Sequence, residues 1–177
     1  SKNLNDIVIT NALRTPIGKY RGNLSSHQAH DLGAVVMKKL LKVSNISQDE
    51  IDEVVMGQVL TGNTGQNPAR QAAIKAGIPN SKTAYIVNQV CGSGIRSVVS
   101  GFQSIKSGDS KIVIAGGQES MSLAPHAIHL RDGKKLGDAE IIDTMIKDGL
   151  WDAFNGYHMG IKAENVAEKF QVTRNEQ

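Results

Sequence analysis

The chain has 177 residues, 40% hydrophobic and 21% charged, a balance typical of globular proteins that argues against a disordered polypeptide. Its single cysteine excludes an internal disulfide. The sequence contains no run of about 18 apolar residues that would predict a membrane span, and its opening residues do not resemble a signal peptide. We therefore expect a cytoplasmic protein. The net charge of +3 is too small to indicate nucleic-acid binding, and a small anionic ligand is sufficient to account for it.

Strand and helix patterns alternate through the first two thirds of the chain. In chain order they predict a strand at 6–12, a helix at 31–43, a strand at 53–60, a helix at 69–76, a strand at 84–90, a helix that ends at Gly108, and a strand at 111–117. Ser47 and Glu50 have the spacing of a capping box, and Pro68 suits the first position of its helix. This alternation predicts an α/β layered fold with a mostly parallel central sheet.

The helix that ends at Gly108 has two contrasting faces. One face is small and polar, and the other carries Ile95, Val98, Val99, Phe102 and Ile105. Because most of the residues outside the apolar stripe are small, we expect this helix to be buried on both sides.

The character of the sequence changes near residue 120. We therefore divide the chain into a domain at 1–120 and an incomplete loop domain at 121–177, with helical stretches at about 138–149 and 160–170 that have no strand partners. The segment 126–137, which precedes these helical stretches, is polar and basic. Thr173 and Glu176 have capping-box spacing, which predicts the start of a helix, and the sequence ends at Gln177 without a helix body.

Cys91 lies where the strand at 84–90 gives way to a glycine-rich turn and then a helix. A thiol at a helix N-terminus faces the positive end of the helix dipole, which stabilises the thiolate, so we expect the pKa of Cys91 to be lowered. Gly92 and Gly94 are expected to permit the tight turn and to leave room for a substrate carbonyl. This placement predicts a nucleophile, although a free cysteine without such neighbours is usually an inert core residue.

Three motifs carry a resemblance to the thiolase family. The segment from Val87 to Val98, which contains Cys91, resembles the acyl-enzyme signature of thiolases. The segment from Ala115 to Ser122 resembles the loop after the next strand of that family. The segment from Asn155 to Gly160 resembles the acyl-pocket segment of its short-chain, acetoacetyl-CoA-type members. The likeness runs through essentially the whole chain but covers only the first half of a typical thiolase, so a C-terminal half domain is expected to be absent.

The resemblance implies a thiolase-like layered fold and an acyltransferase that uses coenzyme A thioesters as substrates, without a cofactor or metal. Cys91 would attack acetyl-CoA to form a thioester, and a second acetyl-CoA would condense to give acetoacetyl-CoA; the reverse reaction is thiolysis. By the same resemblance, the acyl pocket is lined by Leu150, His158 and Met159. The family's base, in a Gly-His-Pro motif, and its second cysteine have no counterparts here, so the chain alone is predicted to be inactive.

Other interpretations remain open at this point. A longer-chain 3-ketoacyl-CoA thiolase, a non-catalytic thiolase-like module for acyl-CoA binding or assembly, and a decarboxylating condensing enzyme share parts of the pattern. The basic segment 126–137 resembles the region of thiolase tetramer contacts, so we expect a homo-oligomer, either a dimer or a tetramer.

Overall fold

The computed structural model describes residues 6–177, which form two compact units. The first, here called the sheet unit, ends at Leu123, and the second, the loop unit, runs from Ala124 to Gln177. The predicted boundary near residue 120 lies close to this division. Each unit is described below by itself.

The sheet unit contains three parallel strands. They are β1 (Glu53–Gly57), β2 (Thr83–Val87) and β3 (Val113–Gly117), in the spatial order β2-β1-β3. The register places Gly57, the last residue of β1, between Val87 and Gly117. All three strands therefore end at one edge, which we call the carboxyl edge.

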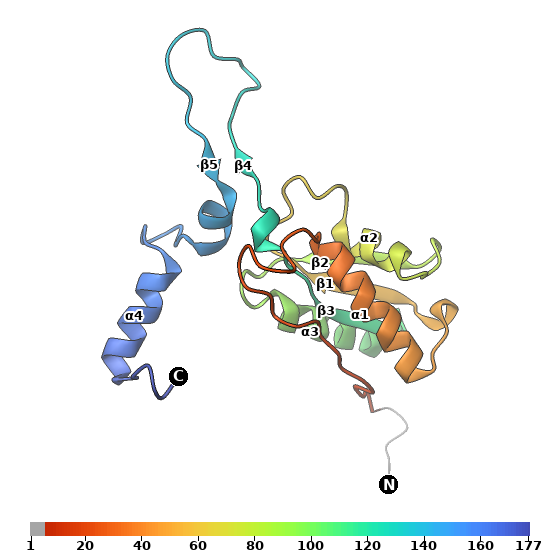
Figure 1. Ribbon diagram of the computed structural model, residues 1–177. Coiled ribbons are helices and arrows are strands. Elements are labelled where there is room, and N and C mark those ends of the chain that lie inside the picture. Colours follow the sequence, from red (N-terminus) through yellow and green to blue (C-terminus); the bar gives the residue numbers. More distant parts are fainter. Residues whose placement is uncertain (1–5) are drawn as a thin grey trace. The chain divides into compact units, whose positions relative to one another are not determined.

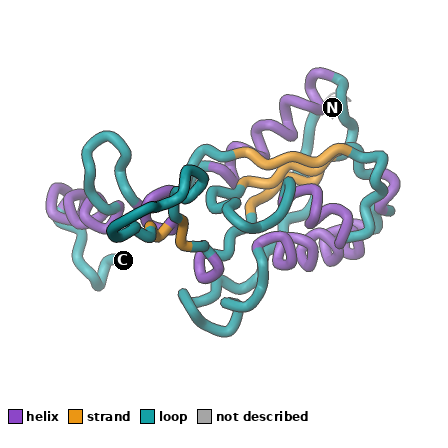
Figure 2. The backbone as a smooth tube through the Cα atoms, turned by 90° about the horizontal axis from the view of Figure 1, so that it is seen from above, coloured by secondary structure: helices purple, strands orange, loops and turns teal. Residues whose placement is uncertain are grey.

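Helices cover both faces of this sheet (Figures 1 and 2). They are α1 (Ala29–Ser44), α2 (Pro68–Lys75) and α3 (Ser93–Ser107), with short 3-10 turns η1 (Gln48–Glu50) and η2 (Met121–Leu123). The connection through α2 moves from the central strand to one edge, and the connection through α3 moves back across it to the other. Because crossovers between parallel strands are right-handed, opposite directions place α2 and α3 on opposite faces. The structure confirms the predicted α/β class.

The main hydrophobic core lies on the face covered by α1 and α2. Its buried side chains are Met37, Leu41, Ile51, Val54, Met56, Ala69, Ala72, Ala73, Ala76, Ile78 and Ile114. The four alanines allow α2 to approach the sheet closely. Two predicted helix starts are also confirmed. Pro68 is in the first turn of α2, and the Ser47–Glu50 capping box is formed at η1.

The strand predicted at 6–12 is wrong. Residues 6–12 join no strand ladder in the structure, and Val8 and Ile9 are 69% and 77% exposed. The apolar run has the local pattern of a strand. A strand also needs a neighbouring backbone to pair with, and this segment is not part of the β2-β1-β3 sheet.

The prediction that α3 is buried on both sides is also wrong. Its small face packs on the sheet, where Ser97 is fully buried and its hydroxyl donates to the Gly116 carbonyl over 2.7 Å. The apolar side chains point outward, and Ile95 and Phe102 are 77% and 50% exposed. Small side chains let the helix backbone approach β3 closely, and this close approach turns the bulky side chains to the outer face of the helix.

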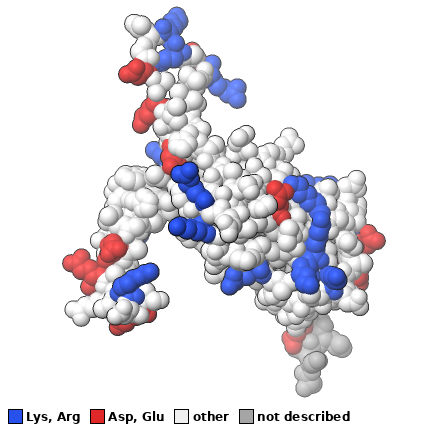
Figure 3. All heavy atoms as spheres, viewed as in Figure 1, with Lys and Arg blue, Asp and Glu red and all other residues white. Residues whose placement is uncertain are grey.

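The loop unit contains short elements. The two-residue strands β4 (His126–Ala127) and β5 (Ile142–Asp143) pair antiparallel, and they are followed by the π-helical turn η3 (Met145–Leu150) and by α4 (Met159–Phe170). The predicted helix at 160–170 is confirmed, the one at 138–149 is limited to η3, and the β4–β5 ladder was not predicted. Lys and Arg side chains project from the loop between β4 and β5 (Figure 3).

The capping box predicted at Thr173 is formed. The Thr173 N–H donates to the Glu176 carboxylate over 2.6 Å, and the Glu176 N–H donates back to the Thr173 hydroxyl over 3.3 Å.

Over residues 6–177, no helix is long and apolar enough to cross a membrane.

Candidate active site at the carboxyl edge of the sheet

Cys91 lies in an exposed turn between β2 and α3. The strand predicted at 84–90 ends earlier, at Val87, and Val90, in the turn that follows, has a φ of +50° in the left-handed region. The left-handed residue is thus Val90, whereas Gly92 has an ordinary φ of −83°. A β-branched residue at positive φ is strained, and such strain is concentrated at functional sites.

Side chains on both sides of Cys91 hold this turn in place. The Ser93 hydroxyl accepts from the Gln89 N–H over 2.9 Å and donates to the Val90 carbonyl over 2.5 Å. The Asn88 side chain accepts from the Val90 N–H over 2.9 Å. These bonds tie together the residues before and after Cys91, so the turn is rigidly defined around an accessible thiol.

The start of α3 rests directly on the ends of β1 and β3. A Cβ added at Gly57 would lie 2.4 Å from the Ser93 carbonyl carbon, and one added at Gly117 would lie 3.4 Å from the Gly94 Cα. The first of these two contacts is so short that it is possible only because Gly57 carries no side chain. Cys91, one residue before the N-cap Gly92, therefore lies at the carboxyl edge near the positive end of the α3 dipole.

A buried polar cluster, not predicted from the sequence, lies at the same edge. Gln58 and Gln118 are 1% and 7% exposed, and the Gln118 side-chain amide donates to the Gln58 side-chain oxygen over 2.9 Å. The Glu119 carboxylate accepts from the N–H groups of Val59 and Leu60, over 2.9 and 3.2 Å. Burial raises the pKa of the Glu119 carboxyl, and these two donors oppose the shift. The available signal was their position, immediately after the ends of two parallel strands.

The three predicted pocket residues lie in the loop unit. An antiparallel bridge between Trp151 and His158 brings Leu150, at the end of η3, toward Met159, at the start of α4. All three predicted residues are partly buried. Cys91 belongs to the sheet unit, and the role of these three residues as an acyl pocket stays a prediction.

His158 also has a structural role, which was not predicted from the sequence. Its Nδ1 accepts from the Gly160 N–H over 2.9 Å, which makes it the N-cap of α4. That ring nitrogen therefore carries no proton in this structure, and the other nitrogen is the one left for contact with a ligand.

Substitutions of His158 test its role as the N-cap of α4. We expect His158→Ala to lower the free energy of unfolding by about 1 kcal/mol, because the Gly160 N–H loses its acceptor. His158→Asn should recover most of that loss, since asparagine is a favourable N-cap. Urea unfolding of the three proteins measures both effects, and equal stability of the Ala and Asn variants would contradict the capping role.

Asp152 is a second structural centre of the loop unit. It is 8% exposed, and its carboxylate accepts from the N–H groups of Phe154 and Asn155, each over 2.9 Å. These bonds, with the Asn155 side chain and Lys162, hold the pKa of Asp152 well below its usual range. Asp152 thus fixes the turn that leads to His158.

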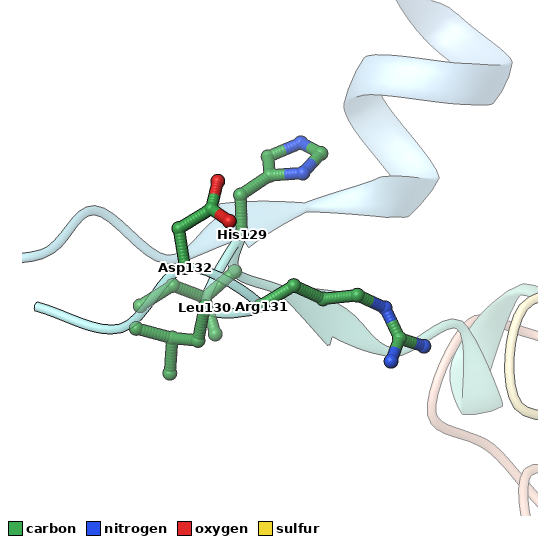
Figure 4. Close-up of a pocket in the computed structure, with 5 residues that line it drawn as sticks. His129, Leu130, Arg131 and Asp132 are labelled. Atoms are coloured by element: carbon green, nitrogen blue, oxygen red, sulfur yellow. The ribbon is translucent and has the colours of Figure 1, made fainter.

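The loop between β4 and β5 lines an open hollow of about 380 Å³ (Figure 4). Its lining comes from one continuous stretch, Ile128, His129, Leu130, Arg131 and Asp132. Arg131 points away from Asp132 in this view, so the two charges do not converge on a ligand position. Within residues 6–177, no group of three His, Cys, Asp or Glu side chains is arranged to hold a metal ion.

Comparison with known proteins agrees with the resemblance seen in the three motifs. The sequence profile described as "Thiolase, N-terminal domain" matches residues 7–177. An acetyl-CoA acetyltransferase of Rhizobium meliloti (strain 1021) is 58% identical over 171 residues, a match that covers 97% of this chain and 44% of the relative. An acetyl-CoA acetyltransferase of Paracoccus denitrificans is 55% identical, over 96% of this chain and 44% of its own length.

A third relative, a probable acetyl-CoA acetyltransferase of Escherichia coli (strain K12), is 50% identical, over 97% of this chain and 44% of its own length. The chain therefore spans less than half the length of the curated relatives that it matches. With its three motifs and the profile match over 7–177, the chain belongs to the thiolase family, to whose N-terminal domain it corresponds.

Proposed function

We propose that this chain supplies the acyl-accepting cysteine of an acetyl-CoA acetyltransferase, which forms acetoacetyl-CoA and CoA from two acetyl-CoA and catalyses the reverse thiolysis. The observation that carries the proposal is the accessible thiol of Cys91, which lies in a strained, hydrogen-bonded turn at the N-terminus of α3. The names of relatives that are 50–58% identical support the acetyl group as the one transferred.

The first half-reaction needs only a thiolate and a thioester. The Cys91 sulfur attacks the acetyl carbonyl carbon, a carbon–sulfur bond to Cys91 forms, and the bond to the CoA sulfur breaks. CoA leaves as a thiolate that takes a proton from solvent, so no oxidant or metal is required. One thioester replaces another, and the free energies of the two nearly balance.

Acylation of the purified chain tests the proposal. We expect incubation with acetyl-CoA to add one acetyl group, located at Cys91 by peptide mass spectrometry and removed again by free CoA. The control is the same chain in urea, which keeps the thiol and loses the turn. The proposal fails if folded and unfolded chains are acetylated at the same rate, or if Cys91→Ala is acetylated equally.

We also propose that the chain associates with itself. The support is apolar surface that the sheet unit leaves uncovered, with Ile95 and Phe102 on α3 at 77% and 50% exposure. Burial of apolar surface stabilises association by roughly 25 cal/mol per Å². We expect light scattering at micromolar concentration to give a mass of at least a dimer, and Phe102→Asp to lower it.

The matched control for that experiment is Gln103→Asp, which places the same charge at a polar, exposed position of the same helix. It should leave the mass unchanged. A monomer of 19.0 kDa for the unsubstituted chain would contradict self-association.

A further inference from the structure

The Glu119 carboxylate is placed where a carboxylate is costly. It is partly buried, and none of the ion pairs among residues 6–177 involves it. A buried charge without a partner of opposite sign is destabilising unless hydrogen bonds compensate it. Here the compensation comes from the N–H groups of Val59 and Leu60. The position of Glu119 is thus tied to one short segment, residues 58–60, which follows β1.

Several further hydrogen bonds fix residues 58–60 and the strand end before them. Beyond the two bonds to Glu119, the Leu60 carbonyl accepts from the Gln58 side chain over 3.0 Å. The Gln58 side-chain oxygen accepts from Gln118, and the Gln118 N–H donates to the Gly57 carbonyl over 3.0 Å. We call these three side chains, Gln58, Gln118 and Glu119, the edge clamp. A hydrogen-bonded network of this kind constrains geometry by the direction of its bonds, which apolar packing does not.

One polar atom of the edge clamp lacks a hydrogen-bond partner. The Gln118 Oε1 is buried and has no hydrogen-bond partner, and a Cβ added at Gly33 of α1 would lie 2.0 Å from it. A buried, unsatisfied oxygen costs stability, which a simple apolar contact at this place would not.

The clamped segment touches the Cys91 turn on both sides. The Gln58 N–H donates to the carbonyl of Val87, the last residue of β2 before the turn, over 3.1 Å. Gly57 lies against the backbone of Ser93, the first residue of α3 after the turn. A shift of residues 57–60 is therefore passed to both ends of the turn that presents Cys91.

From these contacts we propose that Glu119, acting through the edge clamp, is a positioning residue that holds the Cys91 turn in place for acyl transfer. Glu119 touches no reacting atom itself. The assignment rests on the proposed function in one respect, that Cys91 is the reacting thiol. Its effect on the turn is a property of the fold and is measurable without any acyl-CoA.

The test compares Glu119→Gln with Glu50→Gln. Both substitutions replace a carboxylate that accepts backbone N–H bonds by a neutral amide, and Glu50 does so at η1, through a bond of 2.8 Å from the Ser47 N–H. Hydrogen exchange of the full chain should rise about tenfold in residues 57–60 and 88–93 of Glu119→Gln, and at neither place in Glu50→Gln. A general loss of stability would instead raise exchange in α1 and α2 as well.

Two rates at Cys91 separate positioning from exposure. Acetylation by acetyl-CoA depends on the exact direction of the thiol, and we expect it to fall about tenfold or more in Glu119→Gln, as misplacement of a reacting group by about 1 Å costs up to 10²-fold. Alkylation by iodoacetamide requires only an accessible thiolate and should change less than about twofold. If Glu119→Gln does not fold, the double variant Gln58→Met with Gln118→Met removes the amide pair together and should give the same result.

The outcomes are distinguishable. Unchanged exchange in residues 88–93 of a folded clamp variant overturns the proposal, whatever the acetylation rate. Acetylation that stays at the unsubstituted rate, after correction for the folded fraction, overturns it as well. If the unsubstituted chain is not acetylated at all, the proposed function fails, and hydrogen exchange alone decides whether Glu119 holds the turn.

Discussion

A polypeptide of these 177 residues is expected to accept an acetyl group at Cys91 and to turn over no acetoacetyl-CoA. By the thiolase resemblance, condensation and thiolysis need a base and a second proton-transfer group, in a Gly-His-Pro motif and at a second cysteine. The sequence has neither. Each positioned proton-transfer group contributes about 10²- to 10⁴-fold to a rate. We therefore expect a steady-state rate at least about 10⁴-fold below the ordinary enzymatic value of about 10 per second.

A thiolysis assay with acetoacetyl-CoA and free CoA, on material verified by intact mass, measures this. The control is an active thiolase assayed in parallel, together with Cys91→Ala, which should remove the acetyl-enzyme as well. Turnover of about 1 per second or more by the verified chain would contradict the prediction and would assign the base to one of its own histidines. His158→Asn would then be the first variant to assay, because it keeps the α4 cap and removes the imidazole.

Gly57→Ala is expected to have the largest effect on stability of any single methyl addition at the carboxyl edge. The new Cβ would lie 2.4 Å from the Ser93 carbonyl carbon and 2.7 Å from the Gly94 nitrogen. Both are backbone atoms of the α3 start, so no side chain can rotate away to make room. Overpacking a tight site costs about 1–3 kcal/mol and sometimes more, and we expect the upper end of that range.

The matched control is Gly116→Ala on the neighbouring strand β3. A Cβ at Gly116 meets nothing closer than the Met56 sulfur at 3.8 Å, which is an ordinary contact. We expect this variant to lose less than about 1 kcal/mol. Urea unfolding followed by circular dichroism gives both values, and equal stability of the two variants would show that α3 does not rest on Gly57.

Local patterns in the sequence were sufficient for much of the sheet unit. Helical spacing located α1, Pro68 located the start of α2, and the Ser47–Glu50 box located η1. The strand-to-helix change around Cys91 was also visible, as was the thiolase resemblance of that segment, which the profile match confirms. These features depend on residues a few positions apart, so the order of residues alone contains them.

Two errors have a common cause. The apolar run at 6–12 was taken as a buried strand, and the apolar side of α3 was taken as buried, yet Ile9 and Ile95 are each 77% exposed. Hydrophobicity shows that a surface favours burial. It does not show which partner covers that surface, because the partner is distant in sequence.

The sequence by itself thus determined the α/β alternation, the Ser47–Glu50 capping box, the start of α2 at Pro68 and the position of Cys91 before a helix, since each follows from short-range spacing and backbone preferences. The tertiary structure alone decided which face of α3 meets the sheet, that Val90 takes the left-handed conformation, and that Glu119 reaches Val59 and Leu60 from 59 to 60 residues away. Packing and buried hydrogen bonds set these features, and both join segments whose proximity exists only once the parallel strands have paired.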